Sequence, residues 1–342
     1  MHIREATADE LLRWDTLVER FGNCRVTHTL GWLRSLEACG AGKPLCLAFE
    51  QDGHIVGCLP GMLQRRGPLR LFGSPPPGWQ TVSMGPAFDP HRVDSRMILA
   101  ALLPYLQQQC RVDHIELLTH DLDSQTMAEF GFEGEPIETY RAELTPDDPQ
   151  GTFKAIKDSA RRNIRRAERL GLVIRDETDE AFVDEAYDQI DEVFLRGGDT
   201  VSFDRKRVRQ FFRHMKDAGR LVALGVYLPD GDVCIASGLF TVGPRELLLW
   251  QWAHRTAHRW YRGTEAMTWT AMQRAMAAGC TSFDLMGGGE FKAKFGAAAD
   301  WSKVRWTRSR YRWLALGRRL AVRCYRMQQA ARGRLTRRRM AK

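Results

Sequence analysis

A carboxylate, three glycines and two lysines follow one another between residues 284 and 296, and together they could bind an anion and assist a proton transfer. Asp284 ends a short apolar strand predicted over 281–285, and Gly287-Gly288-Gly289 follows after two residues. A carboxylate at the carboxyl end of a strand can act as a general base or orient a substrate amine. The ammonium of Lys292 could hold a phosphate, a carboxylate or a developing oxyanion.

Each of these residues also has a structural interpretation. Asp284 could bond the backbone of its own glycine turn, and Lys292 and Lys294 could be solvated lysines beside a packed phenylalanine. Glu290 could orient a substrate or simply lie exposed. We take Asp284 and Lys292 as candidate catalytic residues and Glu290 as a candidate substrate-binding residue, with the structural interpretation as the alternative.

A second group precedes the helix that is predicted to end at Gly279. Arg259, Arg262, Gly263 and Thr264 lie where a loop enters this helix. Unpaired N–H groups at a helix start favour phosphate, glycine lets the backbone approach closely, and arginine adds charge. These four residues are the candidate cofactor-binding residues, and a surface helix with two solvated arginines is the alternative.

A third group lies on a helix predicted over 152–170. One face is apolar, and seven basic side chains cover the other. Arg162, Asn163 and Arg166 are the candidate substrate-binding residues on it, for an anionic acceptor. A solvated face is the commoner meaning of such a pattern. However, Lys157, Arg161 and Arg165 are spaced four residues apart, so they repel one another unless an anion is bound.

The elements that must position these residues occur in the same order twice. Each half has a hairpin closed by Asp-Gly, at 52–53 and at 230–231, followed by a helix and an apolar strand. Turn-forming residues cluster at 145–151. We therefore predict an internal duplication of a mixed α/β unit, each an antiparallel meander with a crossover. The predicted domains are 1–147 and 148–306, with a basic tail over 307–342.

The net charge of +9 lies in that C-terminal run. No acidic residue follows Asp300, and 303–342 hold fifteen of the 51 Lys and Arg, so the remainder has 36 basic against 42 acidic residues. A helix predicted over 313–330 places apolar residues on one face and arginines around it, and the last residues are predicted to be disordered. We expect such a tail to bind an anionic surface, of phospholipid or of nucleic acid. The alternative is that its apolar face packs on the body.

Several classes of protein are disfavoured. No apolar run approaches the roughly 18 residues of a membrane-spanning helix, and the N-terminus has no signal-peptide pattern. The eight cysteines form no C-x-x-C pair, which favours a reducing cytoplasm over a disulfide framework. His254 and His258 have no third ligand nearby, so we predict no metal site.

Two segments carry a resemblance to a known family. The helix sequence SARRNIRRA from Ser159 and the segment FDLMGGGEFKAKFG over 283–296 resemble the Fem-like and cellulose-biosynthesis-associated acyltransferases of the GNAT superfamily. The resemblance covers roughly 152–306, and Lys-x-x-Phe-Gly is its most distinctive part. It implies tandem GNAT-like domains, each a mostly antiparallel mixed sheet flanked by helices, with the active cleft in or beside the second.

The resemblance also implies a donor and an acceptor. The donor would be acetyl-CoA or a longer acyl-CoA, with its pyrophosphate near 259–264, and the acceptor an amine or hydroxyl on a sugar, a lipid-linked precursor or an amino compound. The segment Arg259-Trp-Tyr-Arg-Gly-Thr departs from the usual Gln/Arg-x-x-Gly-x-Gly/Ala signature. The chain shows no long coiled-coil insertion of the kind expected in Fem proteins that use aminoacyl-tRNA, which favours acyl-CoA.

Three hypotheses follow. The first is a cytoplasmic acyl-CoA-dependent N- or O-acyltransferase for a cell-envelope or exopolysaccharide precursor, with its tail on the inner membrane face. The second is an aminoacyl transferase in which the basic helix and the tail contact tRNA. The third is a non-catalytic GNAT-fold scaffold docked on the membrane.

Overall fold

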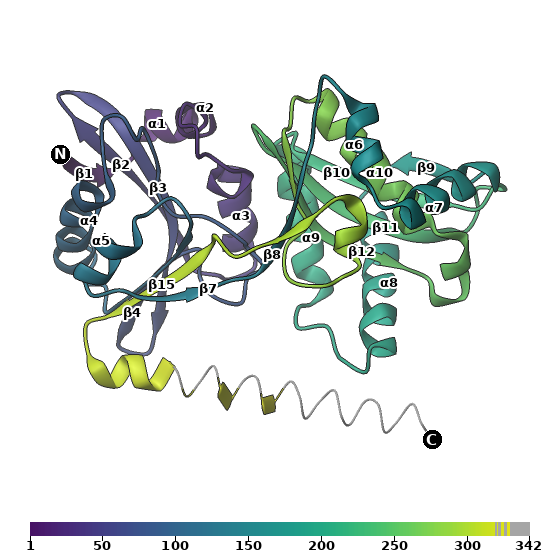
Figure 1. The fold of residues 1–342 in the computed structure, drawn as a ribbon. Coiled ribbons are helices and arrows are strands. Elements are labelled where there is room, and N and C mark those ends of the chain that lie inside the picture. Colours follow the sequence, from purple (N-terminus) through teal and green to yellow (C-terminus); the bar gives the residue numbers. More distant parts are fainter. Residues whose placement is uncertain (319, 321–322, 325–326, 329–342) are drawn as a thin grey trace. The chain divides into compact units, whose positions relative to one another are not determined.

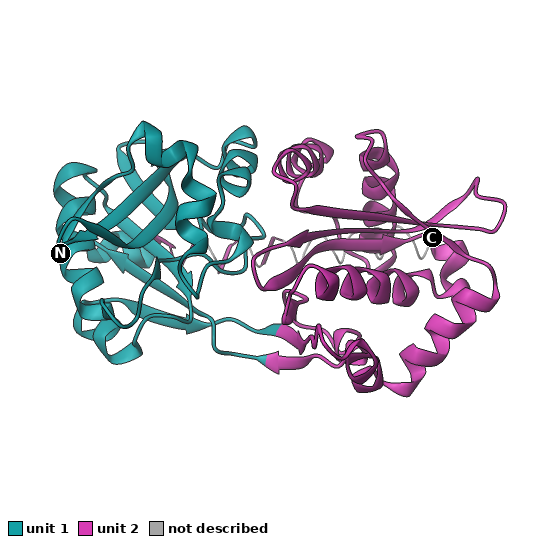
Figure 2. Cartoon of the chain, turned by 90° about the horizontal axis from the view of Figure 1, so that it is seen from above, with its two compact units in different colours: residues 1–139, 300–316 teal, residues 140–299, 317–342 magenta. Residues whose placement is uncertain are grey.

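The computed structural model describes residues 1–318, 320, 323–324 and 327–328, and it divides the chain into two compact units. Unit 1 consists of Met1–Thr139 and Asp300–Leu316, and unit 2 is built on Tyr140–Ala299 (Figure 2). Each unit contains one mixed sheet with helices, which confirms the predicted fold class.

The sheet of unit 1 follows the order β1-β2-β3-β4-β6-β15-β7, and β5 pairs with β3 (Figure 1). Among the strand pairs of this sheet that the described residues form, only β4 and β6 run parallel. Its strands are β1 (His2–Glu5), β2 (Lys43–Gln51), β3 (His54–Arg66), β4 (Leu69–Ser74), β5 (Ala87–Phe88), β6 (His114–Thr119), β7 (Glu133–Pro136) and β15 (Val304–Ser309). Its helices are α1 (Ala8–Leu12), α2 (Trp14–Glu19), η1 (Val26–His28), α3 (Leu30–Ala38), α4 (Ser95–Pro104), η2 (Tyr105–Gln109) and α5 (Ser124–Glu129).

The sheet of unit 2 follows the order β14-β8-β13-β12-β11-β10-β9, and β12 and β13 run parallel. Helices lie on both sides of this sheet (Figure 2). Its strands are β8 (Thr139–Glu143), β9 (Val173–Asp176), β10 (Leu221–Tyr227), β11 (Cys234–Val242), β12 (Glu246–His254), β13 (Ser282–Asp284) and β14 (Ala298–Asp300). Its helices are α6 (Pro149–Ala155), α7 (Asp158–Arg169), α8 (Phe182–Arg196), α9 (Arg205–Asp217), η3 (Thr256–Tyr261), α10 (Gly263–Ala277) and η4 (Lys292–Phe295).

The two predicted hairpins are confirmed, and the repeated order with them. Asp52 and Gly53 turn between β2 and β3 with φ of 52° and 73°, and Gly231 turns between β10 and β11 with φ of 80°. In each unit three antiparallel strands lead to a helix, α4 or α10, and then to a strand that pairs in parallel, β6 or β13. The duplication is therefore one of topology.

Two strands lie in a different sheet from the one predicted. The strand predicted near 137–144 as the last of the first half is β8, which pairs with β13 in unit 2. Conversely, β15 pairs with β6 and β7 in unit 1, although 304–306 were assigned to the second domain and 307–309 to the tail. The physical reason is burial, because Ala142 belongs to the core of unit 2 and Trp306 to that of unit 1.

The basic C-terminal run therefore begins inside a sheet. Lys303 is buried, Arg305 Nε lies 3.4 Å from Glu116 Oε1, and Arg308 Nε donates to the carbonyl of Phe130. These cations belong to the fold of unit 1, so only the run after Arg310 remains as a tail. Within the described residues, no helix has the length and apolarity needed to cross a membrane.

Candidate active site

The parallel strands β12 and β13 separate after three residues. Their pairing ends at Leu248 and Asp284, whereas β12 continues to His254. In the described part of the chain, the outer half of β12 therefore has a strand neighbour only on its β11 side. A β-bulge at this position, between Leu239 and Phe240 of β11, bends the pair further. A strand edge without a neighbouring strand can pair with the amides of an extended ligand.

The start of α10 lies beside this outer half of β12. A Cβ on Gly263 would stand 3.1 Å from Val226 Cγ1 of β10 and 3.5 Å from Ala236 Cβ of β11, and Ala236 pairs with His254. Glycine therefore allows the close approach without displacing Val226. Arg262 precedes it in the left-handed region, with φ of 64°, and its side chain makes no capping hydrogen bond. The side chain of Arg262 thus does not cap the first N–H groups of α10, and N–H groups at a helix start can bind an anion.

All four candidate cofactor-binding residues meet at this turn. Arg259 and Arg262 are exposed, whereas Gly263 and Thr264 are buried. The backbone N–H of Arg262 donates to the carbonyl of Arg259, which closes η3 against α10. The structure thus brings together two exposed arginines and a helix start that the side chain of Arg262 does not cap.

Two of the three candidate residues on α7 face the same turn. Asn163 Nδ2 donates to Glu265 Oε1 at 2.9 Å, and Glu265 is 3% exposed in the first turn of α10. The guanidinium of Arg166 lies 5.4 Å from the ring centre of Trp260. Arg162 points elsewhere and is exposed beside Asp158. Sequence reasoning did not single out Glu265, although its position two residues after Gly263 marked a polar group in the first turn of the helix.

Asp284 precedes the glycine loop and Lys292 follows it, and both side chains form hydrogen bonds with the loop backbone. Asp284 is fully buried, and its Oδ1 accepts a hydrogen bond from the N–H of Met286 at 2.8 Å. Lys292 Nζ donates to the carbonyl of Met286 and, at 3.0 Å, to that of Gly287. Both side chains thus contact the backbone of the loop between them. Glu290 is exposed on the same loop.

The segment after the loop packs against the outer half of β12. The ring of Trp252 lies 5.5 Å from Phe291 and 5.7 Å from Phe295, and Phe295 is buried. The N–H of Lys157, just before α7, donates to the carbonyl of Lys294. The Lys-x-x-Phe-Gly motif therefore ties α7 and the glycine loop to β12, and its phenylalanine is a core residue.

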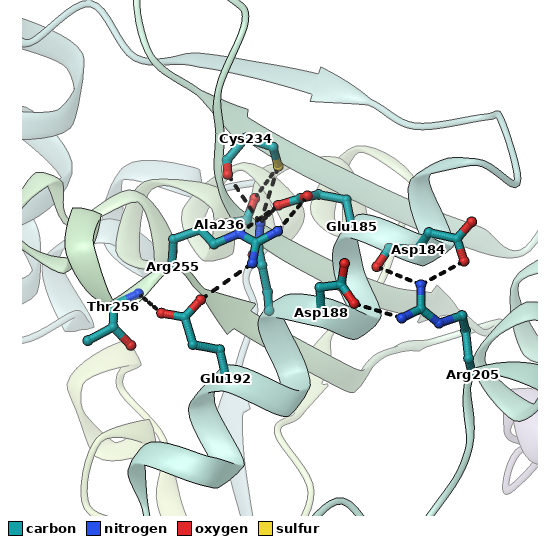
Figure 3. Close-up of polar contacts among 10 residues, drawn as sticks. Asp184, Glu185, Asp188, Glu192, Arg205, Cys234, Ala236, Arg255 and Thr256 are labelled. Atoms are coloured by element: carbon teal, nitrogen blue, oxygen red, sulfur yellow. Dashed lines mark hydrogen bonds and ion pairs between the residues drawn. The ribbon is translucent and has the colours of Figure 1, made fainter. Parts of the chain in front are cut away.

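An ion-pair network on α8 fixes the loop that leaves β12 (Figure 3). Arg255 Nη2 lies 2.7 Å from Glu185 Oε2, and Glu192 Oε1 accepts the N–H of Thr256 at 2.6 Å. Burial alone would raise the pKa of Glu192, but the hydrogen bonds from Thr256 and Arg255 hold it below its usual value. The carboxylate therefore stays ionised and anchors the entry to η3.

His254 lies at the end of β12, next to this network. Burial lowers its pKa below the usual range, and the charge of Arg196 adds to the effect. Arg196 Nη1 lies 3.0 Å from His254 Nε2. Among the residues that the structure describes, no group of three or more His, Cys, Asp or Glu is arranged to hold a metal.

In unit 1 the helix that corresponds to α10 is α4, and its start is capped by a carboxylate. A cavity of about 500 Å³ lies at the starts of α4 and α5, and Asp94, Asp121 and Asp123 contribute to its lining. Asp94 caps α4 by accepting the N–H of Met97, and Asp123 caps α5. Because carboxylates already occupy these helix starts, they disfavour an anionic ligand. The open helix start of α10 distinguishes unit 2.

Comparison with family models identifies the region that contains this site. Residues 154–295 match the acetyltransferase (GNAT) domain. The match begins at the end of α6 and ends in η4, so it includes α7, the separating strands, the start of α10 and the glycine loop. The search of curated proteins gave no match.

Solved structures share the fold over most of the chain. FemX is similar over 89% of this chain and 97% of its own, with a TM-score of 0.74 and 13% identity. L-PGS from Bacillus licheniformis covers 98% of each chain, with a TM-score of 0.54 and 13% identity. A tandem GNAT protein from the clavulanic acid biosynthesis pathway covers 91% of this chain and 98% of its own, with a TM-score of 0.51 and 13% identity. Residues 154–295 therefore match an acetyltransferase domain of the GNAT type, the fold of the whole chain is that of tandem GNAT structures, and these findings support an acyltransferase.

Proposed function

We propose that the protein transfers an acyl group from acetyl-CoA or a longer acyl-CoA to an amine or hydroxyl of a cell-envelope or exopolysaccharide precursor. The separation of β12 from β13 beside the open start of α10 carries this proposal. The unpaired edge of β12 suits a ligand with amide groups, and the helix start suits a pyrophosphate. An acyl-CoA carries both groups on one extended molecule.

In this proposal Arg259 and Arg262 contact the phosphates, while the N–H groups of Gly263 and Thr264 donate to them. Guanidinium groups form charge-assisted hydrogen bonds with phosphate, and the helix dipole adds to the attraction. Glu265 lies in the same turn, but its carboxylate is buried and accepts from Asn163, so it is directed into the protein.

The reaction is a direct acyl transfer. The acceptor nitrogen or oxygen attacks the thioester carbonyl, a C–N or C–O bond forms, the C–S bond breaks, and the acceptor proton passes to the thiolate to give free CoA. We assign Asp284 and Lys292 to the shaping of the glycine loop, because both contact its backbone. Catalysis then depends on how the loop and β12 position the two substrates.

The acceptor class rests on the resemblance to the Fem-like and cellulose-biosynthesis-associated acyltransferases and on the basic surface of α7. Arg162, Arg165, Arg166 and Arg169 are all exposed on this helix. A basic surface beside the donor turn suits a small-molecule or lipid-linked acceptor that carries phosphate.

Calorimetric titration of the full chain with acetyl-CoA and longer acyl-CoAs tests the donor. We expect binding to at least one, weakened roughly 10²- to 10⁴-fold in Arg259→Ala/Arg262→Ala, since each of the two charge-assisted hydrogen bonds contributes about 1.5–3 kcal/mol. Arg65→Ala, an exposed arginine on β3 of unit 1, is the matched control and should bind as the wild type. A folded protein that binds no acyl-CoA contradicts the proposal.

The exposed arginines of α7 also support a second candidate, an aminoacyl-tRNA-dependent transferase. That enzyme would bind tRNA with an affinity that falls steeply with salt. Substituting Arg162, Arg165 and Arg169 by Gln should then weaken tRNA binding and leave acyl-CoA binding unchanged. Absence of tRNA binding at low salt removes this candidate.

A further inference from the structure

The helix after β15 presents an apolar stripe to solvent. Residues 312–318 are helical, as are the described residues that follow. Trp313 is 60% exposed, Leu316 57%, Leu320 53% and Met327 55%. The sequence predicts one helix over 313–330, and at about 100° per residue these positions, with exposed Cys324, fall within an arc of roughly 80° on it. They therefore form a single face, which we call the 313–327 stripe.

The part of the chain that carries the stripe is also strongly basic. Of the fifteen basic residues after Asp300, four precede Tyr311, so 311–342 hold eleven Lys or Arg and no Asp or Glu. Arg312 and Arg323 are exposed on the same helix as the stripe. Tyr311 and Trp313, at the start of the helix, stack with ring centres 5.7 Å apart. Aromatic rings at one end, an apolar face and flanking arginines suit the boundary between lipid headgroups and acyl chains.

We propose that the 313–327 stripe docks this protein on an anionic lipid bilayer, with the apolar residues below the headgroups and the arginines among them. Charge alone would fit a nucleic acid equally well, since both are polyanions. The apolar stripe favours the bilayer. Acyl chains can bury the exposed Leu and Met side chains, whereas phosphodiesters cannot. The proposal is independent of the identity of the donor or the acceptor.

Flotation of the full chain with vesicles tests the proposal. We expect binding to vesicles of phosphatidylcholine with phosphatidylglycerol, and little binding to phosphatidylcholine alone, since a single amphipathic helix needs both attractions. Leu316→Ser/Leu320→Ser should lower the bound fraction roughly tenfold or more without changing the charge. Leu12→Ser is the control, because Leu12 is an even more exposed leucine on α1 of unit 1, outside the stripe, and this variant should bind as the wild type.

A second readout locates the contact. Lipids brominated on the acyl chain should quench part of the tryptophan fluorescence, and Trp313→Phe should abolish that quenching. The proposal is overturned if the wild type does not float with anionic vesicles, or if the double serine variant floats as well as the wild type. It is also overturned if single-stranded RNA binds while vesicles do not, or if the serine variant changes only the dimer content of the protein.

Discussion

The sharpest test of the candidate site separates two roles for Asp284. Its side chain is fully buried and accepts the N–H of Met286 at 2.8 Å. Asp284→Ala removes this acceptor, and leaving a buried donor unsatisfied costs about 1–3 kcal/mol. For a unit of 150–250 residues, a loss of about 2 kcal/mol lowers the unfolding midpoint by roughly 4–8 °C. Asp284→Asn keeps an acceptor oxygen and should lose less than half as much.

The assay combines calorimetric unfolding with the rate of CoA release in the same two variants. If Asp284 only shapes the loop, activity should follow stability, so that Asn retains activity within about tenfold and Ala does not. Removal of a true general base lowers the rate by roughly 10²–10⁴-fold. An Asn variant that is as stable as the wild type yet has lost that much activity would refute the structural assignment. So would an Ala variant with an unchanged midpoint.

Three further predictions follow from other contacts. Gly263→Val should lower acyl-CoA affinity and cost about 1–3 kcal/mol of stability, measured by titration and urea unfolding, because even a Cβ would approach Val226 to 3.1 Å. Asn163→Ala should destabilise unit 2 by roughly 1.5–3 kcal/mol in urea unfolding, since it removes the donor to the buried Glu265 carboxylate. His28 is buried, and its pKa is lowered to about 4, chiefly by burial. The folded state therefore binds a proton on His28 less readily than the unfolded state does. The free energy of unfolding should fall as pH drops from about 6.5 to about 4. Acid titration of unfolding should show a smaller fall in His28→Gln.

The local signals in the sequence predicted the order of elements well. Asp-Gly turns and alternating apolar runs determine hairpins over short distances, so β2–β3 and β10–β11 could be predicted. Membership of a sheet is a long-range property. Nothing local distinguishes β8 or β15 from a strand of the neighbouring sheet, and only the burial of Ala142 and Trp306 determines it.

Only the local part of the candidate site could be predicted from the sequence, for the same reason. Residues 259–264 are adjacent in the sequence, so their meeting at one turn needed no knowledge of the fold. The contact between Asn163 and Glu265 spans 102 residues and required α7 to pack on α10. The contacts of Lys292 with the carbonyls of Met286 and Gly287 depend on the path of the glycine loop, which residue types alone do not determine.

The position of β15 bears on how the chain folds during synthesis. This strand lies between β6 and β7 in unit 1, yet it is made after all of Tyr140–Ala299. The sheet of the first unit therefore stays incomplete on the ribosome until residue 309 has emerged, whereas the second unit already has all of its strands once residue 300 is free. The chain thus completes its second sheet before its first, and β7 must wait without its neighbour while the acyltransferase domain folds.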